Sequence, residues 1–176
     1  MSFDFASRPG QGEYGDFHVG YIAAVPAGDI RETLARESAA AEAFYGAIPE
    51  GLCDHAYAPG KWTIREVVAH LADSERVFAY RALRFGRADP TPLAGFDQDR
   101  WVPECHAGTR KWSDLLGDFS AVRTASLHLF RSFAEVDWAR RGEASGVPVS
   151  VRTLAFVIAG HELHHRRILA ERYGVA

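Results

Sequence analysis

Residues 157–168 read VIAGHELHHRRI, and two of their histidines, His161 and His165, are four positions apart. At about 100° per residue, a helix places these two imidazoles one turn apart and on nearly the same face. The apolar side chains of the surrounding sequence fall on that face as well: Leu154, Val157, Ile158 and Ile168. The stretch therefore predicts a helix whose apolar stripe continues through two imidazoles. His164 lies at the edge of the stripe and is the weaker candidate for a shared site.

Three other segments repeat apolar residues at helical spacing, over residues 30–47, 64–85 and 112–133. Capping residues stand at the expected starts of helices: Asp29, Thr63 with Glu66 three residues on, and Ser150 before the last helix. That last helix is expected to reach Tyr173 and to stop at Gly174. Four amphipathic helices with almost no alternating strand pattern predict an all-α four-helix bundle.

The segments between the predicted helices differ in length and composition. Residues 1–26 contain four glycines and Pro26 and are predicted to form an irregular N-terminal arm, whereas residues 27–176 are predicted to form a single domain. Residues 86–108 are rich in proline and glycine, and a connection of this length is uncommon unless it crosses the bundle or lines a site. We therefore predict a long crossover connection there. Residues 142–148 are expected to form a short hairpin or turn.

Composition narrows the class of protein. The chain has 176 residues with 23 acidic and 20 basic side chains, for a net charge of -3, which argues against nucleic acid as a partner. No run approaches the roughly 18 apolar residues of a membrane span, so no membrane partner is expected. The two cysteines, Cys53 and Cys105, form no C-x-x-C pair and are predicted to be reduced in a cytoplasmic protein.

A pair of histidines at this spacing can chelate a divalent metal, or it can be a pair of core residues bonded to backbone or water. A metal site needs a third ligand, and His70 stands on the flank of the apolar face of the helix predicted over 64–85. The segment also contains H-E-x-x-H, with Glu162 between the histidines. A zinc peptidase of the longer pattern would have glycine and histidine where this chain has Ile168 and Glu171, which disfavours that interpretation.

Four segments together resemble the DinB/YfiT-like family: residues 57–66 (YAPGKWTIRE), 70–84 (HLADSERVFAYRALR), 95–97 (GFD) and 160–165 (GHELHH). The resemblance extends from about residue 28 to the end of the chain. It implies a four-helix bundle, often a homodimer, with one divalent metal ion, zinc or nickel, held by three histidines. The positions that match these ligands are His70, His161 and His165.

The resemblance implies a metal-dependent enzyme that acts on a small-molecule substrate. The first hypothesis is a thiol S-transferase that joins a low-molecular-weight thiol co-substrate, such as bacillithiol, to a small electrophile. The second is a hydrolase that uses metal-bound hydroxide, with Glu162 either moving a proton or standing as a solvated helix residue. The third is a metal-binding stress protein without catalysis. No catalytic residue is assigned, and Arg81, about 16 Å from His70 along the helix axis, is expected to form an ordinary ion pair. Aromatic packing is expected for Trp62 and Trp101.

Overall fold

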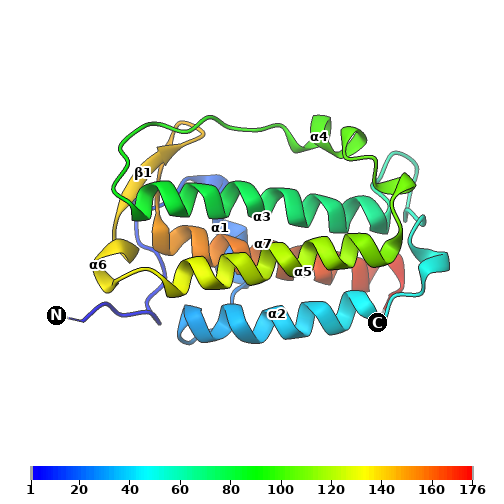
Figure 1. Ribbon diagram of the computed structural model, residues 1–176, viewed down its shortest axis with the longest axis horizontal. Coiled ribbons are helices and arrows are strands. Elements are labelled where there is room, and N and C mark those ends of the chain that lie inside the picture. Colours follow the sequence, from blue (N-terminus) through cyan, green and yellow to red (C-terminus); the bar gives the residue numbers. More distant parts are fainter. Residues whose placement is uncertain (1, 176) are drawn as a thin grey trace.

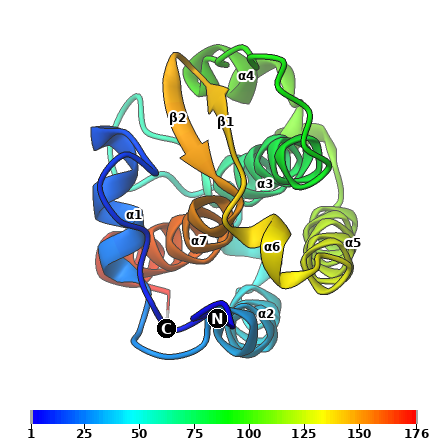
Figure 2. The ribbon, with the colours of Figure 1, turned by 90° about the vertical axis from the view of Figure 1, so that its left-hand side faces the viewer.

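The computed structural model describes residues 2–175, and four long helices make up its bundle (Figure 1). They are α2 (Ile30–Gly46), α3 (Ile64–Gly86), α5 (Trp112–Arg131) and α7 (Val151–Tyr173). Viewed along the bundle, α5 and α7 occupy opposite corners, and each packs against both α2 and α3 (Figure 2). The predicted all-α four-helix bundle is confirmed.

Local side-chain hydrogen bonds explain where the helices that carry the histidines begin. At the start of α3, Thr63 Oγ1 accepts a hydrogen bond from the Glu66 amide, and Glu66 Oε2 accepts one from the Thr63 amide. At the start of α7, Ser150 Oγ accepts a hydrogen bond from the Thr153 amide at 3.0 Å. The same helix ends at Gly174, whose φ of 68° suits a residue without a Cβ atom. Each predicted cap is present.

The connection between α3 and α5 runs the length of the bundle. These two helices are neighbours that point in the same direction, so the chain has to return along them before α5 begins (Figure 1). The returning segment, residues 87–111, contains α4 (Gln98–Glu104) and the short 3-10 helix η3 (Ala107–Thr109). The predicted long crossover connection is confirmed.

A β-hairpin closes one end of the bundle between α5 and α7. The elements there are α6 (Glu135–Trp138), β1 (Arg141–Ala144) and β2 (Val147–Ser150). The turn residues Ser145 and Gly146 both have positive φ, 56° and 77°, as a two-residue type I′ turn requires. The Ser145 amide donates a hydrogen bond of 3.0 Å to the carbonyl of Leu93. The tip of the hairpin is thereby tied to the crossover connection.

The N-terminal segment contains a short helix that no pattern in the sequence predicts. The 3-10 turn η1 (Asp16–His18) leads into α1 (Val19–Ala24), which packs against the outer face of α7 (Figure 2). The two backbones approach closely at Gly160, where a Cβ atom would stand 1.9 Å from the carbonyl oxygen of Tyr21. This approach is possible because residue 160 is glycine.

The predicted irregular arm over residues 1–26 is therefore wrong for residues 16–24. Packing against α7 stabilises a helix of six residues that has Gly20 near its start, and this long-range contact leaves no local signal in the sequence. Because α1 packs on the bundle, the boundary drawn at residue 26 falls inside one packed unit.

The apolar core has two parts, and a buried polar layer lies between them. Phe78 and Phe156 belong to the part near the hairpin, whereas Leu71 and Leu169 belong to the part near the opposite end. The polar layer includes six side chains around the histidines: His70, Ser74 and Glu75 on α3, Arg123 on α5, and His161 and Glu162 on α7. Within residues 2–175, no helix is long and apolar enough to cross a membrane. The buried polar groups need partners or a ligand to offset the loss of hydration.

Candidate metal site

Three imidazoles from two helices converge inside the bundle. His70 comes from α3, and His161 and His165 come from successive turns of α7. The Nε2 atom of His161 lies 3.0 Å from that of His70 and 3.2 Å from that of His165. One potential ligand atom from each residue lies within 4.8 Å of the other two. The structure thus brings together the three histidines that the sequence singled out.

These three rings cannot satisfy one another by hydrogen bonding. The Nε2 atom of a neutral imidazole either donates a proton or offers a lone pair, but not both. His161 Nε2 faces two other Nε2 atoms, so at most one of its two close contacts is a hydrogen bond. A single cation accepts all three lone pairs at once. The donor set therefore fits a divalent metal ion better than it fits a cluster of core histidines.

Burial keeps the three imidazoles neutral. Loss of hydration lowers the pKa of His70 to about 4. Burial, followed by the charge of the neighbouring His70, lowers the pKa of His165 to about 3. The pKa of His161 is likewise held well below its ordinary value, first by burial and then by the other two imidazoles. At neutral pH all three lone pairs are available to a metal ion.

Neighbouring side chains hold the rings in place. Ser74 Oγ lies 3.3 Å from Nδ1 of His70, and accepting the proton on Nδ1 leaves the Nε2 lone pair free. The Trp62 ring lies 4.8 Å from the His70 ring and stacks at 17° on His165. On the other side, the Tyr21 ring meets His161 edge-on at 5.2 Å. The aromatic packing expected of Trp62 is thus packing against the cluster itself.

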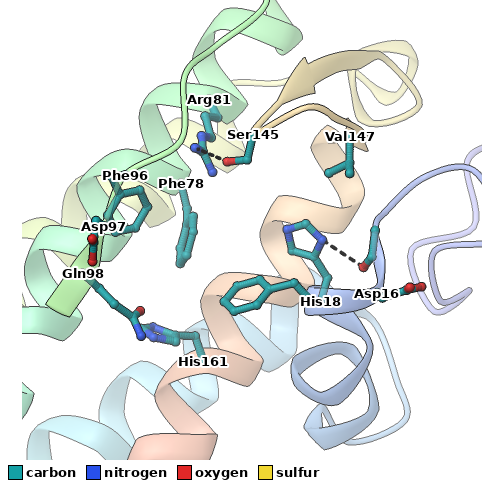
Figure 3. A pocket seen from close by; sticks show the side chains of 12 residues that line it. Asp16, His18, Phe78, Arg81, Phe96, Asp97, Gln98, Ser145, Val147 and His161 are labelled. Carbon is teal, nitrogen blue, oxygen red and sulfur yellow. Dashed lines mark hydrogen bonds between the residues drawn. The ribbon is translucent and has the colours of Figure 1, made fainter.

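A cavity of about 430 Å³, here called the main cavity, opens beside His161. Figure 3 shows that, besides His161 on α7, side chains from four other parts of the chain surround it. They include His18 from the N-terminal segment, Phe78 and Arg81 from α3, Phe96 from the crossover connection, and Ser145 from the hairpin. Its volume suits a small organic molecule. A second cavity of about 220 Å³, lined in part by Trp62 and Lys61, lies beside His165.

Two of the sequence-based expectations for side chains near the histidines are wrong. Glu162 is not a solvated residue: it is 0% exposed, accepts a hydrogen bond from Tyr45 Oη at 2.9 Å and pairs with Arg166 at 3.2 Å. Glu162 faces α2. Because α1, α2 and α3 cover α7 on several sides, this face of the helix does not meet water. Arg81 forms no ion pair with residues 2–175 and lines the same cavity as His161.

The other histidines stay outside the cluster, and one of them, His18, lines the main cavity. His164 stays outside the cluster and packs edge-on against Tyr21. His18 lines the main cavity, and its Nδ1 donates to the carbonyl of Gly15 at 3.2 Å. Its Nε2 lone pair is therefore free of that bond. No pattern in the sequence indicated this role, because His18 stands between Gly15 and Gly20 in a segment predicted to be irregular.

The comparisons with known proteins agree with this fold. The model of the DinB superfamily matches residues 33–169. The "Putative metal-dependent hydrolase OB0413" of Oceanobacillus iheyensis is 29% identical over 112 residues, which are 62% of this chain and 63% of that protein. The alignment thus spans less than two thirds of the relative. Among solved structures, YfiT from Bacillus subtilis matches with a TM-score of 0.67 at 19% identity, over 97% of this chain and 95% of that chain.

The fold and the site define a class of helical proteins with a candidate metal site. Its features are a four-helix bundle in which α3 and α5 are parallel neighbours, a full-length crossover connection and three converging imidazoles. YfiT is described as a probable metal-dependent hydrolase with an unusual four-helix bundle topology, and at this identity the likeness shows the shared fold. The family model covers well over half of the chain. The protein belongs to the DinB superfamily.

Proposed function

We propose that the protein is a metal-dependent enzyme in which His70, His161 and His165 hold one divalent cation. The observation that carries this proposal is the approach of the His70 and His165 Nε2 atoms to that of His161, because hydrogen bonding can satisfy at most one of the two contacts. Two relatives whose names describe metal-dependent hydrolases add support. Zinc and nickel are the ions we favour, since both accept imidazole nitrogen.

The donor set determines what a bound ion would do. Three neutral imidazoles leave the charge of a divalent cation uncompensated, and the cluster includes no carboxylate from residues 2–175. Such an ion supplies Lewis-acid chemistry, lowering the pKa of a thiol or of water that binds to it. The chain's own part is to keep the imidazoles neutral, to orient His70 through Ser74 and to offer the main cavity to a second reactant.

The reaction we propose first is transfer of a low-molecular-weight thiol to a small electrophile. In this reaction the thiol loses its proton to solvent, its sulfur forms a bond to carbon, and a leaving group such as chloride departs. A carboxylate base is not needed once the thiol is ionised. This suits the site, because the carboxylate of Glu162 is turned toward Tyr45 and Arg166. The same orientation disfavours the peptidase interpretation of the H-E-x-x-H segment.

The test measures metal and activity on the same samples. We expect one equivalent of metal in the protein, its loss in His161→Ala, and its retention in the matched control His164→Ala. The metal-loaded protein should accelerate the reaction of a small thiol with monochlorobimane, and a chelator should abolish the acceleration. Retention of the metal by His161→Ala would overturn the site. A metal-loaded protein without either thiol-transfer or hydrolytic activity would instead favour a metal-stabilised protein without catalysis.

A metal-dependent hydrolase is the second candidate, favoured by the names of the two relatives and by His18. The free Nε2 lone pair of His18, which lines the same cavity as His161, can accept a proton from water. Hydrolysis of ester or amide substrates without added thiol, abolished by a chelator and strongly slowed in His18→Gln, would support the hydrolase. Chelator-sensitive thiol transfer unaffected by His18→Gln would support the transferase.

A further inference from the structure

Arg81 is a buried cation without an anionic partner. Only 4% of the residue is exposed, although it carries a charge. None of the ion pairs within residues 2–175 includes it. Arg123, the other arginine buried this deeply inside the bundle, pairs with Glu75 at 2.8 Å. A buried guanidinium is costly unless something compensates its charge.

The hydrogen bonds of Arg81 use one end of the guanidinium and leave the other end free. Its Nη2 donates to the carbonyl of Ala94 at 2.9 Å and to Ser145 Oγ at 3.0 Å. The Nε and Nη1 atoms donate to no group within residues 2–175, and they are not among the fully enclosed polar atoms. The side chain lines the main cavity together with His161 (Figure 3). The side chain therefore brings unused donors to the edge of a space that a ligand can enter.

The acidic residues at the main cavity are engaged elsewhere or directed away from it. Asp97 Oδ1 accepts hydrogen bonds from the Asp99 and Arg100 amides at the start of α4. Asp16 is exposed, and its carboxylate points away from the other lining side chains (Figure 3). His18 is kept neutral, because burial and then the charge of Arg81 lower its pKa. The end of the cavity at Arg81 is thus uniformly favourable to an anion.

Apolar side chains separate Arg81 from the histidines. The Phe96 ring centre lies 5.8 Å from the Arg81 guanidinium carbon and 6.4 Å from the Phe78 ring centre. The Phe78 ring in turn meets His161 edge-on at 5.7 Å. A ligand that extends from one end of the cavity to the other therefore passes along two aromatic rings. Such a wall favours an aliphatic or aromatic middle section.

We propose that the main cavity binds a small carboxylate whose anionic group accepts hydrogen bonds from Nη1 of Arg81 and whose opposite, reactive end approaches the three histidines. Nη1 carries two hydrogens and shares the positive charge of the guanidinium, so it can make a charge-assisted hydrogen bond to a carboxylate oxygen. This inference rests on the proposed metal-dependent function and specifies the chemical class of its substrate. The tie between Ser145 and Nη2 then has a purpose: it fixes the plane of the guanidinium before the ligand arrives.

The test uses binding to cobalt-loaded protein, read from the thiolate-to-cobalt absorption. Mercaptocarboxylates with the thiol at one end and the carboxylate at the other, from about three to ten carbons, are compared with alkanethiols of equal length. We expect the carboxylate to strengthen binding about tenfold to a hundredfold at the matching length, as befits charged hydrogen bonds. Arg81→Met should abolish that preference. The control Arg84→Gln, three residues further along α3 and outside the cavity lining, should retain it.

A second variant and an experiment on metal-free protein test the same inference independently. If Arg81→Met does not fold, Arg81→Lys keeps the charge but lacks the Nη1 donor and should show a reduced preference. In metal-free protein, hexanoate should raise the melting temperature where hexanol does not, and Arg81→Met or Arg81→Lys should reduce that rise. Equal binding of carboxylates and alkanethiols at every length would overturn the inference while leaving the metal site intact. Failure of cobalt to bind would instead overturn the proposed function, and the hexanoate arm would still decide the inference.

Discussion

The carbonyl oxygen of Tyr21 stands where a Cβ atom of residue 160 would have to lie, at 1.9 Å, so only glycine allows α1 to dock on α7. Gly160 directly precedes His161, and the docked Tyr21 ring packs edge-on against that imidazole. One close backbone contact therefore positions both the N-terminal wall of the main cavity and one side of the histidine cluster.

Gly160→Ala should push α1 away from α7 and destabilise the protein by about 1–3 kcal/mol, the usual cost of overpacking. Urea unfolding measures this loss. The control is Gly117→Ala on α5, where a Cβ atom would meet nothing within 4 Å, so the variant should be as stable as the parent or more stable by up to about 1 kcal/mol. Equal stability of the two variants would show that α1 does not dock as described.

The metal-free protein should lose stability as the pH falls from about 6.5 to about 4. Burial lowers the pKa of His70 from 6.5 to about 4 and that of His165 to about 3, so in this window the unfolded chain binds more protons than the folded one. Melting temperatures between pH 7 and pH 4 measure the effect. A double variant, His70→Asn with His165→Asn, should show a shallower dependence; the same slope in both proteins would contradict the assignment.

Glu162→Gln should lower the stability but spare catalysis. The carboxylate holds Tyr45 Oη and Arg166 inside the bundle, and weakening these charged contacts is expected to cost about 1–3 kcal/mol. The folded, metal-loaded variant should retain thiol transfer or hydrolysis within about a factor of two. Tyr45→Phe, which removes the hydroxyl partner, is the companion variant. A loss of activity by a factor of a hundred or more in Glu162→Gln alone would restore Glu162 as a proton carrier.

Breaking the buried ion pair of Glu75 and Arg123 should destabilise the protein strongly, whereas replacing both residues with apolar ones should change its stability much less. Arg123 Nε donates to both carboxylate oxygens of Glu75, at 3.0 and 2.9 Å. Arg123→Met leaves a buried charge without a partner and should destabilise the protein by about 3–5 kcal/mol. Adding Glu75→Leu should recover most of that loss. Unfolding by urea of the two single variants and the double variant gives the coupling between the residues.

The parts of the fold that the sequence could predict depend on local signals. The capping box of Thr63 and Glu66 and the stop at Gly174 are fixed by residues within one turn of each helix end, and both are present. The same holds for the hairpin, because Ser145 and Gly146 suit the turn that joins its strands. The i, i+4 spacing of His161 and His165 is likewise local, which is why these imidazoles could be placed on one face.

The sequence-based predictions that were wrong all concern residues whose environment depends on contacts between distant segments. The α1 helix is stabilised by α7, and residues 16–24, with one glycine and a short apolar run, carry no helical pattern of their own. Glu162 lies about 100° from its neighbour on the helix and was expected to meet water, but α2 covers that face. Arg81 is distant from His70 along α3, yet the fold brings Arg81 to the same cavity as His161, between the hairpin and the crossover connection. No helical periodicity of a single segment contains this information.

The crossover connection shapes the main cavity, whereas the helices carry the histidine cluster, so ligand selection and the proposed reactive centre lie on different parts of the chain. Residues 96–98 form one wall of the main cavity but belong to none of the four long helices, and the hydrogen bond between Leu93 and the hairpin anchors the segment on one side. Exchanging this strap for one of another length or composition would reshape the space offered to a ligand without touching an imidazole. Descendants of such a scaffold can diversify in what they accept by altering a single stretch of chain while inheriting the reactive centre unchanged.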